Sequence, residues 1–334
     1  MASRKTPKKK SSGNRSGRPG ARPVLARGAA APAPVRPARL GDWIRAARPA
    51  TLGLGFAPVL LGWAVAYLQF LIDDLNPWDI LPVSVVALCF VVALALQIGV
   101  NFANDYSDGV RGTDAHRVGP ARLTGSGAAP AKRVRLVAFV FFGVAALAGV
   151  GITVLTQIWW LPAVGAAAIA AGWFYTGGKK PYGYAGLGEI MVFLFFGIVA
   201  TAGTAFLLVQ AVWIDSILTG VAMGLFAMAV LHINNMRDRA TDIAAGKRTL
   251  ATRMPLWLGR AFYTLLVVAP FGILVYFTLI LISAGWTYFA LFIAVPALLI
   301  TWTATTAREY VLVLKLTVWL SLAYAVLLGY AFAF

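Results

Sequence analysis

Apolar residues dominate the chain from about residue 50 onward, in runs close to the length of a membrane-spanning helix. Such a helix needs about 20 predominantly apolar residues. The runs predict nine transmembrane helices, near 50–70, 81–103, 135–155, 159–176, 188–209, 214–235, 260–282, 286–304 and 311–333. Two stretches without a charged residue, 136–178 and 261–307, each hold two of these helices. The pattern therefore predicts an all-α polytopic membrane protein with residues 41–334 as the membrane domain.

The polar segments between these runs alternate in charge. Nearly all Lys and Arg residues lie in the N-terminal tail and in the segments 104–135, 177–187, 236–259 and 305–310. The alternate segments near 71–80, 156–158, 210–213 and 283–285 contain none. By the positive-inside rule, the first set faces the cytoplasm. We therefore expect a cytoplasmic N-terminus and an external C-terminus, which agrees with an odd number of crossings.

Composition separates a tail, residues 1–40, from the membrane domain. The tail holds 11 Lys and Arg residues and no acid, in a chain of net charge +17, and is otherwise rich in Pro, Ala, Gly and Ser. Such a segment cannot bury a core and is predicted to be disordered. We expect it to contact anionic membrane lipid rather than nucleic acid. The single cysteine, Cys89, excludes a disulfide framework or a cysteine-based metal site.

Carboxylates are concentrated in two segments at predicted cytoplasmic ends of helices. The first is NDYSD, residues 104–108, and the second is DRATD, residues 238–242. With one acid beyond the first segment, they contain Asp105, Asp108, Asp114, Asp238 and Asp242. A carboxylate near the hydrocarbon layer is costly, and one at a helix C-terminus opposes the helix dipole. These acids therefore indicate a functional site.

Helical spacing places further polar side chains beside these acids. Residues on one face of the second and sixth predicted helices are Gln97, Asn101, Asn104, Asp105, Asp108, Asn234, Asp238 and Asp242, with Asn235 adjacent. Hard oxygen donors without cysteine or paired histidine favour Mg²⁺ over zinc or copper. Two facing carboxylate pairs predict a diphosphate site with two Mg²⁺ ions, for which Mn²⁺ is the alternative.

Cations in the same loops would balance an anionic ligand, because unpaired charge is costly away from water. The candidates are Arg111, Arg117, Arg122, Lys179, Lys180, Arg237, Lys247 and Arg248. For each of them, cytoplasmic topology is a sufficient explanation by itself. His116 and His232 do not pair in sequence and are interpreted as structural. Glu189, an acid just inside the fifth predicted helix, either pairs with Lys179 or Lys180 or acts on a substrate hydroxyl.

These motifs resemble those of the UbiA-type intramembrane prenyltransferases. The resemblance covers about residues 43–334 and rests on NDYSD with Asp114, on DRATD, and on Tyr175-x-x-x-Lys179 between them. It implies a nine-helix bundle in the bacterial plasma membrane, with a cavity on the cytoplasmic side. One departure is Gly112, where the broad superfamily pattern has its third aspartate.

The similarity is greater to the branch that prenylates 1,4-dihydroxy-2-naphthoate for menaquinone synthesis. It is carried by NFANDYSDGVRGTD (101–114), RVGPARL (117–123), GLGEIMVFLFFG (186–197), NNMRDRATDIAAGKRTLA (234–251) and WIRAARPATL (43–52). The resemblance implies transfer of a polyprenyl group to this acceptor, with loss of CO2 and diphosphate and formation of demethylmenaquinol.

The resemblance also implies roles for individual residues. Mg²⁺ on the polyprenyl diphosphate would be held by Asp105, Asp108, Asp114, Asp238 and Asp242. Tyr175 and Lys179 would belong to the catalytic group. Substrate and metal waters would be oriented or neutralised by Asn101, Asn104, Arg111, Arg122, Glu189, Asn234, Asn235, Lys247 and Arg248.

Three rival functions are consistent with parts of the pattern. The acceptor could be hydroxybenzoate, homogentisate, a porphyrin alcohol or a sugar phosphate, because the metal site would be similar. A cation-coupled transporter also buries acids, but its path must reach both faces, whereas these polar motifs share one side. A scaffold with a basic lipid-binding tail is the third reading.

Overall fold

Helices make up nearly all of the structure, a computed structural model that describes residues 1–2, 36–77, 82–112 and 122–334. Within those residues there is no strand, and eight helical segments are long and apolar enough to span a membrane. They are α2 (Gly53–Ile72), α4 (Val83–Arg111), α5 (Ala131–Thr156), α7 to α8 (Gly188–Val209), α9 (Ile214–Arg237), α12 (Leu256–Ile280), η4 with α13 (Ile282–Thr303) and α14 (Ala307–Ala333). The all-α membrane fold predicted from the sequence is confirmed. Most of the predicted tail, residues 3–35, lies outside the description.

The ninth predicted segment corresponds to α6 (Leu161–Phe174), an apolar helix of 14 residues. Its length of about 21 Å is less than the roughly 30 Å of a hydrocarbon core. The ninth membrane crossing therefore stays a prediction. The assignment of one face of the protein to the cytoplasm also stays a prediction.

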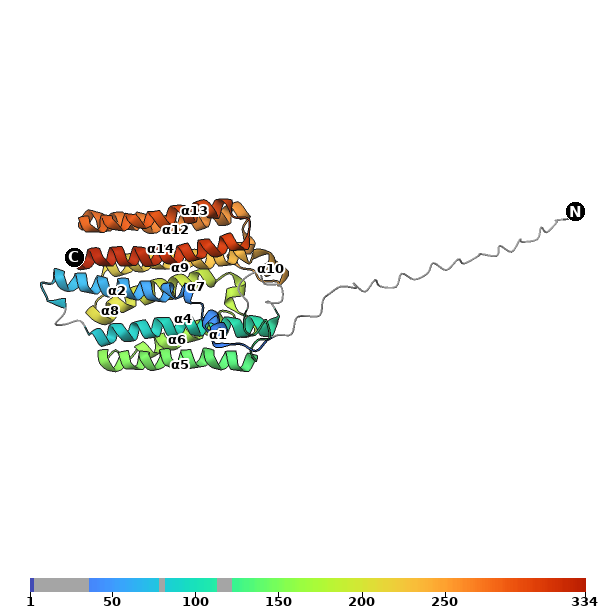
Figure 1. The fold of residues 1–334 in the computed structure, drawn as a ribbon, viewed down its shortest axis with the longest axis horizontal. Helices are drawn as coiled ribbons and strands as arrows, with labels where there is room; N and C mark the ends of the chain where they lie inside the picture. The colour runs from blue at the N-terminus through green and yellow to red at the C-terminus, as the bar shows by residue number, and fades with distance from the viewer. Residues whose placement is uncertain (3–35, 78–81, 113–121) are drawn as a thin grey trace. The chain divides into compact units, whose positions relative to one another are not determined.

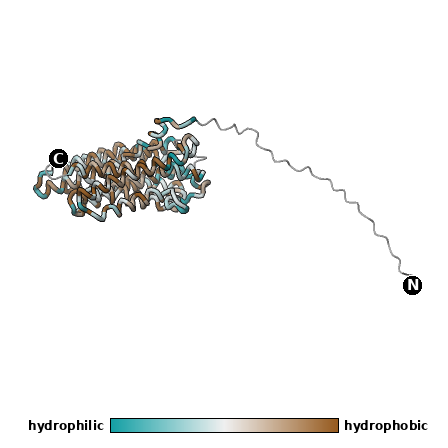
Figure 2. The backbone as a smooth tube through the Cα atoms, turned by 90° about the horizontal axis from the view of Figure 1, so that it is seen from below, coloured by the Kyte–Doolittle hydropathy of each residue, from teal (hydrophilic) through white to brown (hydrophobic). Residues whose placement is uncertain are grey.

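The helices of residues 36–334 lie side by side with apolar residues along their middle. Figure 1 shows α12 and α13 at one edge and α5 and α6 at the other, with α2, α9 and α14 between them. Figure 2 shows hydrophobic residues along the middle of the helices and hydrophilic residues toward both ends of the bundle. Among α2, α9, α12 and α14, large side chains such as Phe226 and Tyr324 are fully buried. The Tyr263 and Thr317 hydroxyls bond at 2.7 Å between α12 and α14.

Helix α4 carries the first acidic segment. Its 29 residues extend about 44 Å, longer than the hydrocarbon core, so its last turns can project into the polar region. The helix ends at Arg111 and is capped by Gly112, whose φ of 72° is left-handed backbone that glycine adopts without strain. The apolar run predicted an end near residue 103. Residues 104–108 lie inside the helix, as the helical spacing of their polar side chains predicted, and these side chains find partners on neighbouring segments.

The second acidic segment lies across a helix break. Helix α9 ends at Arg237, Asp238 follows as its C-cap, and α10 (Arg239–Ala244) begins directly after. The Asp242 amide still donates to the Asp238 carbonyl at 2.8 Å. The four-residue spacing predicted from the sequence is therefore kept, although one continuous helix is not.

A π-helical segment, η3 (Phe193–Val199), lies between α7 (Gly188–Val192) and α8 (Ala200–Val209). It packs closely on α9, because a Cβ on Gly197 would lie only 2.5 Å from the Gly224 Cα. Widened turns of this kind occur frequently at functional sites. The segment contributes one wall of the cavity described next.

Candidate active site

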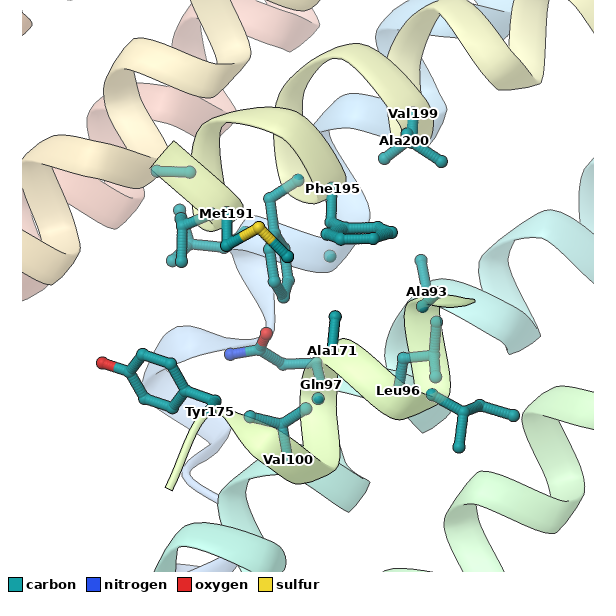
Figure 3. Close-up of a pocket in the computed structure, with 18 of the residues that line it drawn as sticks. Ala93, Leu96, Gln97, Val100, Ala171, Tyr175, Met191, Phe195, Val199 and Ala200 are labelled. Carbon is teal, nitrogen blue, oxygen red and sulfur yellow. The ribbon is translucent and has the colours of Figure 1, made fainter. Parts of the chain in front are cut away.

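A cavity of about 920 Å³ lies among α4, α6, the α7–α8 segment and α9. Its lining includes residues near both ends of α6, Trp160 and Thr176, so it follows that helix along its length. In Figure 3, Met191 and Phe195 face Gln97 and Tyr175 across the space. Most of the lining is apolar, and the carboxylates are confined to three aspartates: Asp108, Asp238 and Asp242. An elongated apolar cavity with one acidic end suits an amphiphilic ligand.

Asp108 connects several elements at that end. Its side chain is buried, with one oxygen accepting a bond from the Arg122 guanidinium at 2.7 Å. The other oxygen accepts a bond from the Tyr184 hydroxyl and lies 3.7 Å from the Lys247 ammonium. These charged and hydroxyl donors offset the cost of burying the carboxylate.

Lys247 joins the two acidic segments. Its ammonium lies 3.5 Å from an Asp242 oxygen as well as 3.7 Å from Asp108, and 4.6 Å from the centre of the Tyr184 ring. Burial raises the pKa of the Asp242 carboxyl, and Lys247 opposes that effect. Asp238 forms a bidentate pair with the Arg237 guanidinium, whose Nε and Nη2 donate to the two carboxylate oxygens at 2.8 and 2.6 Å. The sequence expectation that both segments meet at one place is met by this geometry.

Asp105 has a different environment from the other aspartates. Its two oxygens accept the backbone N–H groups of Leu123 and Thr124, at 2.9 and 2.8 Å. The residue is 2% exposed and is absent from the cavity lining. This carboxylate anchors the segment that carries Arg122, so the structure places it behind the acidic end.

The asparagines named from the sequence line the cavity and link it to neighbouring segments. Asn101 donates to the Ala47 carbonyl at 2.9 Å, and Asn104 accepts from the Thr176 hydroxyl at 2.7 Å. Asn234 also lines the space, and Asn235 donates to Glu189 at 3.1 Å.

Glu189 is buried and is bonded to Asn235 rather than paired with a lysine. Its second neighbour is His232, with 3.9 Å between the Glu189 oxygen and the imidazole Nδ1. Lys179 and Lys180 are exposed. The alternative in which Glu189 pairs with one of these lysines is therefore wrong, because a closer buried amide and imidazole occupy its surroundings.

The remaining predicted cations divide into two groups. Arg122 and Lys247 line the cavity, as described. Arg111 instead donates to the Thr176 and Gly178 carbonyls and lies 5.5 Å over the Tyr184 ring, and Arg248 is exposed. The structure does not bring Arg111, Lys179 or Arg248 to the carboxylates. Asp114, His116 and Arg117 fall outside the described residues.

Two cavity residues were missed by sequence reasoning. Tyr184 had no signal, because an aromatic residue in a loop is ordinary. Arg48 could have been found from its position just before Pro49 at the start of the first membrane helix. Its φ of 55° and ψ of 65° are left-handed, a conformation that costs a non-glycine residue on the order of 1–3 kcal/mol. Such strain at a lining residue points to a functional constraint.

The acidic end has the oxygen donors that Mg²⁺ requires when it is shared with a ligand. The described residues contain no group of three His, Cys, Asp or Glu side chains that could hold a metal ion by themselves. Mg²⁺ is usually held by one or two carboxylates together with waters and substrate phosphate. Asp108 and Asp242, from different segments, already converge on one positive charge, that of Lys247. The donor set therefore fits an ion shared with a phosphorylated ligand.

Membrane-length helices around an apolar cavity with a charged end define an integral membrane protein with an internal site for an amphiphilic ligand. Residues 56–310 match the UbiA prenyltransferase family, and the chain belongs to this family. It is 47% identical, over 65% of its length and 71% of the relative's, to the 1,4-dihydroxy-2-naphthoate octaprenyltransferase of Mycobacterium tuberculosis. The identity to the Escherichia coli protein of the same name is 34%, over 81% and 86% of the two chains.

A solved structure shares the fold. The chain resembles the apo structure of a UbiA homolog from Aeropyrum pernix K1, with a TM-score of 0.58 over 82% of this chain and 96% of that one. At 13% sequence identity, this likeness concerns the fold alone.

Proposed function

We propose that this chain transfers a polyprenyl group from polyprenyl diphosphate to 1,4-dihydroxy-2-naphthoate, a step of menaquinone synthesis. The observation that carries the proposal is the meeting of two aspartate segments at the polar end of a long apolar cavity. The acceptor follows the name shared by relatives of 34% to 47% identity. The products are demethylmenaquinol, diphosphate and CO2.

Asp108, Asp238 and Asp242, with the neighbouring Asn104, are the residues that would hold Mg²⁺ at the diphosphate. The bound ion supplies positive charge that stabilises diphosphate as a leaving group. Arg122 and Lys247 line the cavity beside Asp108 and Asp242 and are the cations that would reach the diphosphate oxygens, whereas Arg237 pairs with Asp238. We retain two ions as the proposal, since the acids form two separate groups.

The apolar lining protects the reaction. The C–O bond of the donor breaks with its electron pair on diphosphate, which leaves an allylic cation that water would capture. Phe195, Val199 and their neighbours exclude water from this part of the cavity. The same apolar length accommodates polyprenyl chain, whose continuation can pass into membrane lipid.

The acceptor would be oriented by its own negative charge. We assign its carboxylate to Arg48, the lining arginine with strained backbone. The ring carbon that bears the carboxylate forms the new C–C bond, and the carboxylate leaves as CO2. The electron pair of the broken bond restores aromaticity, so no proton has to leave carbon.

An acceptor panel tests the proposal. Purified protein in detergent is given Mg²⁺, a polyprenyl diphosphate and, in turn, 1,4-dihydroxy-2-naphthoate, 4-hydroxybenzoate or homogentisate. Of the three acceptors, we expect only the naphthoate to give a prenylated product. Product formed with another acceptor and not with the naphthoate would overturn the acceptor assignment while leaving the prenyl transfer in place.

We also propose a bacterial plasma-membrane location with the acidic end on the cytoplasmic side, from the distribution of Lys and Arg. Single cysteines placed at Lys180 and at Gln157 in a Cys89→Ser chain test this orientation in intact cells. A membrane-impermeant thiol reagent should label position 157 and not position 180. The reverse labelling would invert the topology.

A further inference from the structure

A buried polar group beside the cavity is not used by the reaction described above. It consists of Glu189 at the start of α7, and Asn235 and His232 on α9. Their exposures are 2%, 7% and 0%. Buried polar side chains of this kind are costly unless their partners are specified. The hydrogen bonds within the group therefore indicate how each side chain is oriented and which of its atoms are available to a ligand.

The histidine faces Glu189 with a defined nitrogen. His232 Nε2 lies 3.0 Å from the Gly259 carbonyl oxygen. A carbonyl can only accept, so Nε2 carries a hydrogen and Nδ1 is the nitrogen directed at Glu189. The ring also packs edge-on against Phe262, with 5.0 Å between the ring centres. His232 is thus fixed in place beside Glu189, with 3.9 Å between its Nδ1 and Glu189 Oε1, a distance too long for a hydrogen bond.

The carboxylate in turn fixes the amide of Asn235. Glu189 Oε1 accepts a hydrogen bond, so the Asn235 atom 3.1 Å away must be the NH2 group. Glu189 does not line the cavity, whereas Asn235 does. With one hydrogen of its NH2 group taken by Glu189, the hydrogen-bond acceptor that Asn235 can offer to the cavity is its carbonyl oxygen.

We propose that Glu189 is a positioning residue that holds the Asn235 carbonyl oxygen toward the cavity, where it accepts a hydrogen bond from a hydroxyl of the aromatic acceptor. This inference rests on the proposed function and names a further determinant of acceptor binding. A hydrogen bond from the phenolic hydroxyl increases electron density on the ring and thus favours its attack on the allylic cation. Decarboxylation leaves no proton to remove from carbon, so the reaction needs no general base at this position. The oriented Asn235 carbonyl oxygen is sufficient to bind and activate the aromatic substrate.

Glu189→Gln tests the orientation without changing side-chain size. A glutamine can present either its oxygen or its nitrogen, so Asn235 is free to turn its NH2 group to the cavity. We expect the KM for 1,4-dihydroxy-2-naphthoate to rise about tenfold, with the KM for the polyprenyl diphosphate unchanged. Glu309→Gln, at the exposed start of α14, is the matched control and should leave both values unchanged.

A second substitution separates positioning from a purely structural role. In Glu189→Gln with Asn235→Asp, the glutamine NH2 can donate to the new carboxylate, and an oxygen again faces the cavity. The double variant should recover acceptor KM to within about threefold of wild type. Asn235→Asp alone places two carboxylates together and should lower the melting temperature. Melting of each variant in detergent is measured alongside the kinetics.

The contrary outcomes are distinct. An unchanged acceptor KM in Glu189→Gln, equal rises in both KM values, or no recovery in the double variant would each overturn the positioning role. A wild-type protein that prenylates only a different phenol would overturn the proposed acceptor, and the same comparison on that phenol's KM would still decide the role of Glu189.

Discussion

Among the site residues, Asp105 and Asp108 differ most in role although they are three positions apart. One carboxylate holds backbone N–H groups of the following segment, and the other faces the cavity with Arg122 and Lys247. Helical spacing alone placed both on the same face and suggested the same function. The two residues differ because the segment 122–124 lies against Asp105 and its backbone N–H groups bond the Asp105 carboxylate.

Substitution of Asp108 should therefore affect the rate, whereas substitution of Asp105 should affect the stability. Asp108→Asn removes a charge at the acidic end and should lower kcat about 100-fold or more, because electrostatic stabilisation of a leaving group is lost. Asp105→Asn can accept only one of the two backbone bonds and should cost about 1–3 kcal/mol of stability. Rates across a Mg²⁺ titration and thermal melting in detergent measure both, with exposed Asp73→Asn as control.

If Asp105→Asn shifted the Mg²⁺ concentration needed for half-maximal rate as much as Asp108→Asn did, the anchoring role would be wrong. The direct metal ligation expected from the sequence motif would then hold for Asp105.

Arg48 gives a second prediction at this scale. Arg48→Gln should raise the KM for the naphthoate about tenfold or more and leave the KM for the diphosphate donor within about twofold, because loss of one charged hydrogen bond costs roughly 1.5–3 kcal/mol. Steady-state kinetics with each substrate varied in turn provide the measurement, and exposed Arg308→Gln is the control. A larger effect on the donor than on the acceptor would contradict the assignment.

At the scale of elements, hydropathy predicted the positions of the helices to within a few residues at most ends. It could not predict the longer α4, the break of α9 at Asp238 or the π-helical η3. These features depend on polar partners and on hydrogen-bond register, neither of which changes the apolar pattern. The two aspartate motifs were predicted, whereas Tyr184 and the Glu189–Asn235–His232 group required three-dimensional contacts.

Close packing of η3 on α9 is testable through Gly197. An added methyl group in Gly197→Ala would lie 2.5 Å from Gly224 Cα and 2.6 Å from the Gly220 carbonyl oxygen. We expect a loss of about 1–3 kcal/mol from overpacking, together with reduced turnover because the cavity wall shifts. Gly272→Ala on α12, with open space around it, should keep wild-type melting and rate. Equal melting of the two variants would contradict this packing.

At the scale of the whole molecule, charge is distributed between the helical unit and the basic tail. Arg36 still belongs to the helical unit, because it bonds Asp42 at 2.7 Å beside α1 (Leu40–Ala46). The sequence predicted the fold class, the family and the naphthoate acceptor, with other aromatic and non-aromatic acceptors as alternatives. That choice depends on cavity residues from separate segments, which a pattern along the chain does not bring together.

Deletion of residues 1–35 should therefore retain most of the turnover, since α1 and the segment up to Arg48 remain intact. The rate of the shortened protein in detergent and in vesicles with anionic lipid is the measurement. A shortened protein that lost activity in detergent would make the tail part of the catalytic unit; a loss in vesicles alone would agree with lipid contact.

In the proposed reaction, both aspartate segments act on one prenyl transfer coupled to decarboxylation. The most direct test follows CO2 from carboxyl-labelled 1,4-dihydroxy-2-naphthoate and diphosphate from the donor in one reaction. We predict release of the two at one to one with Mg²⁺, and neither above background with EDTA or in Asp108→Asn with Asp242→Asn. Diphosphate released without CO2, or a double variant with near wild-type rate, would contradict the account.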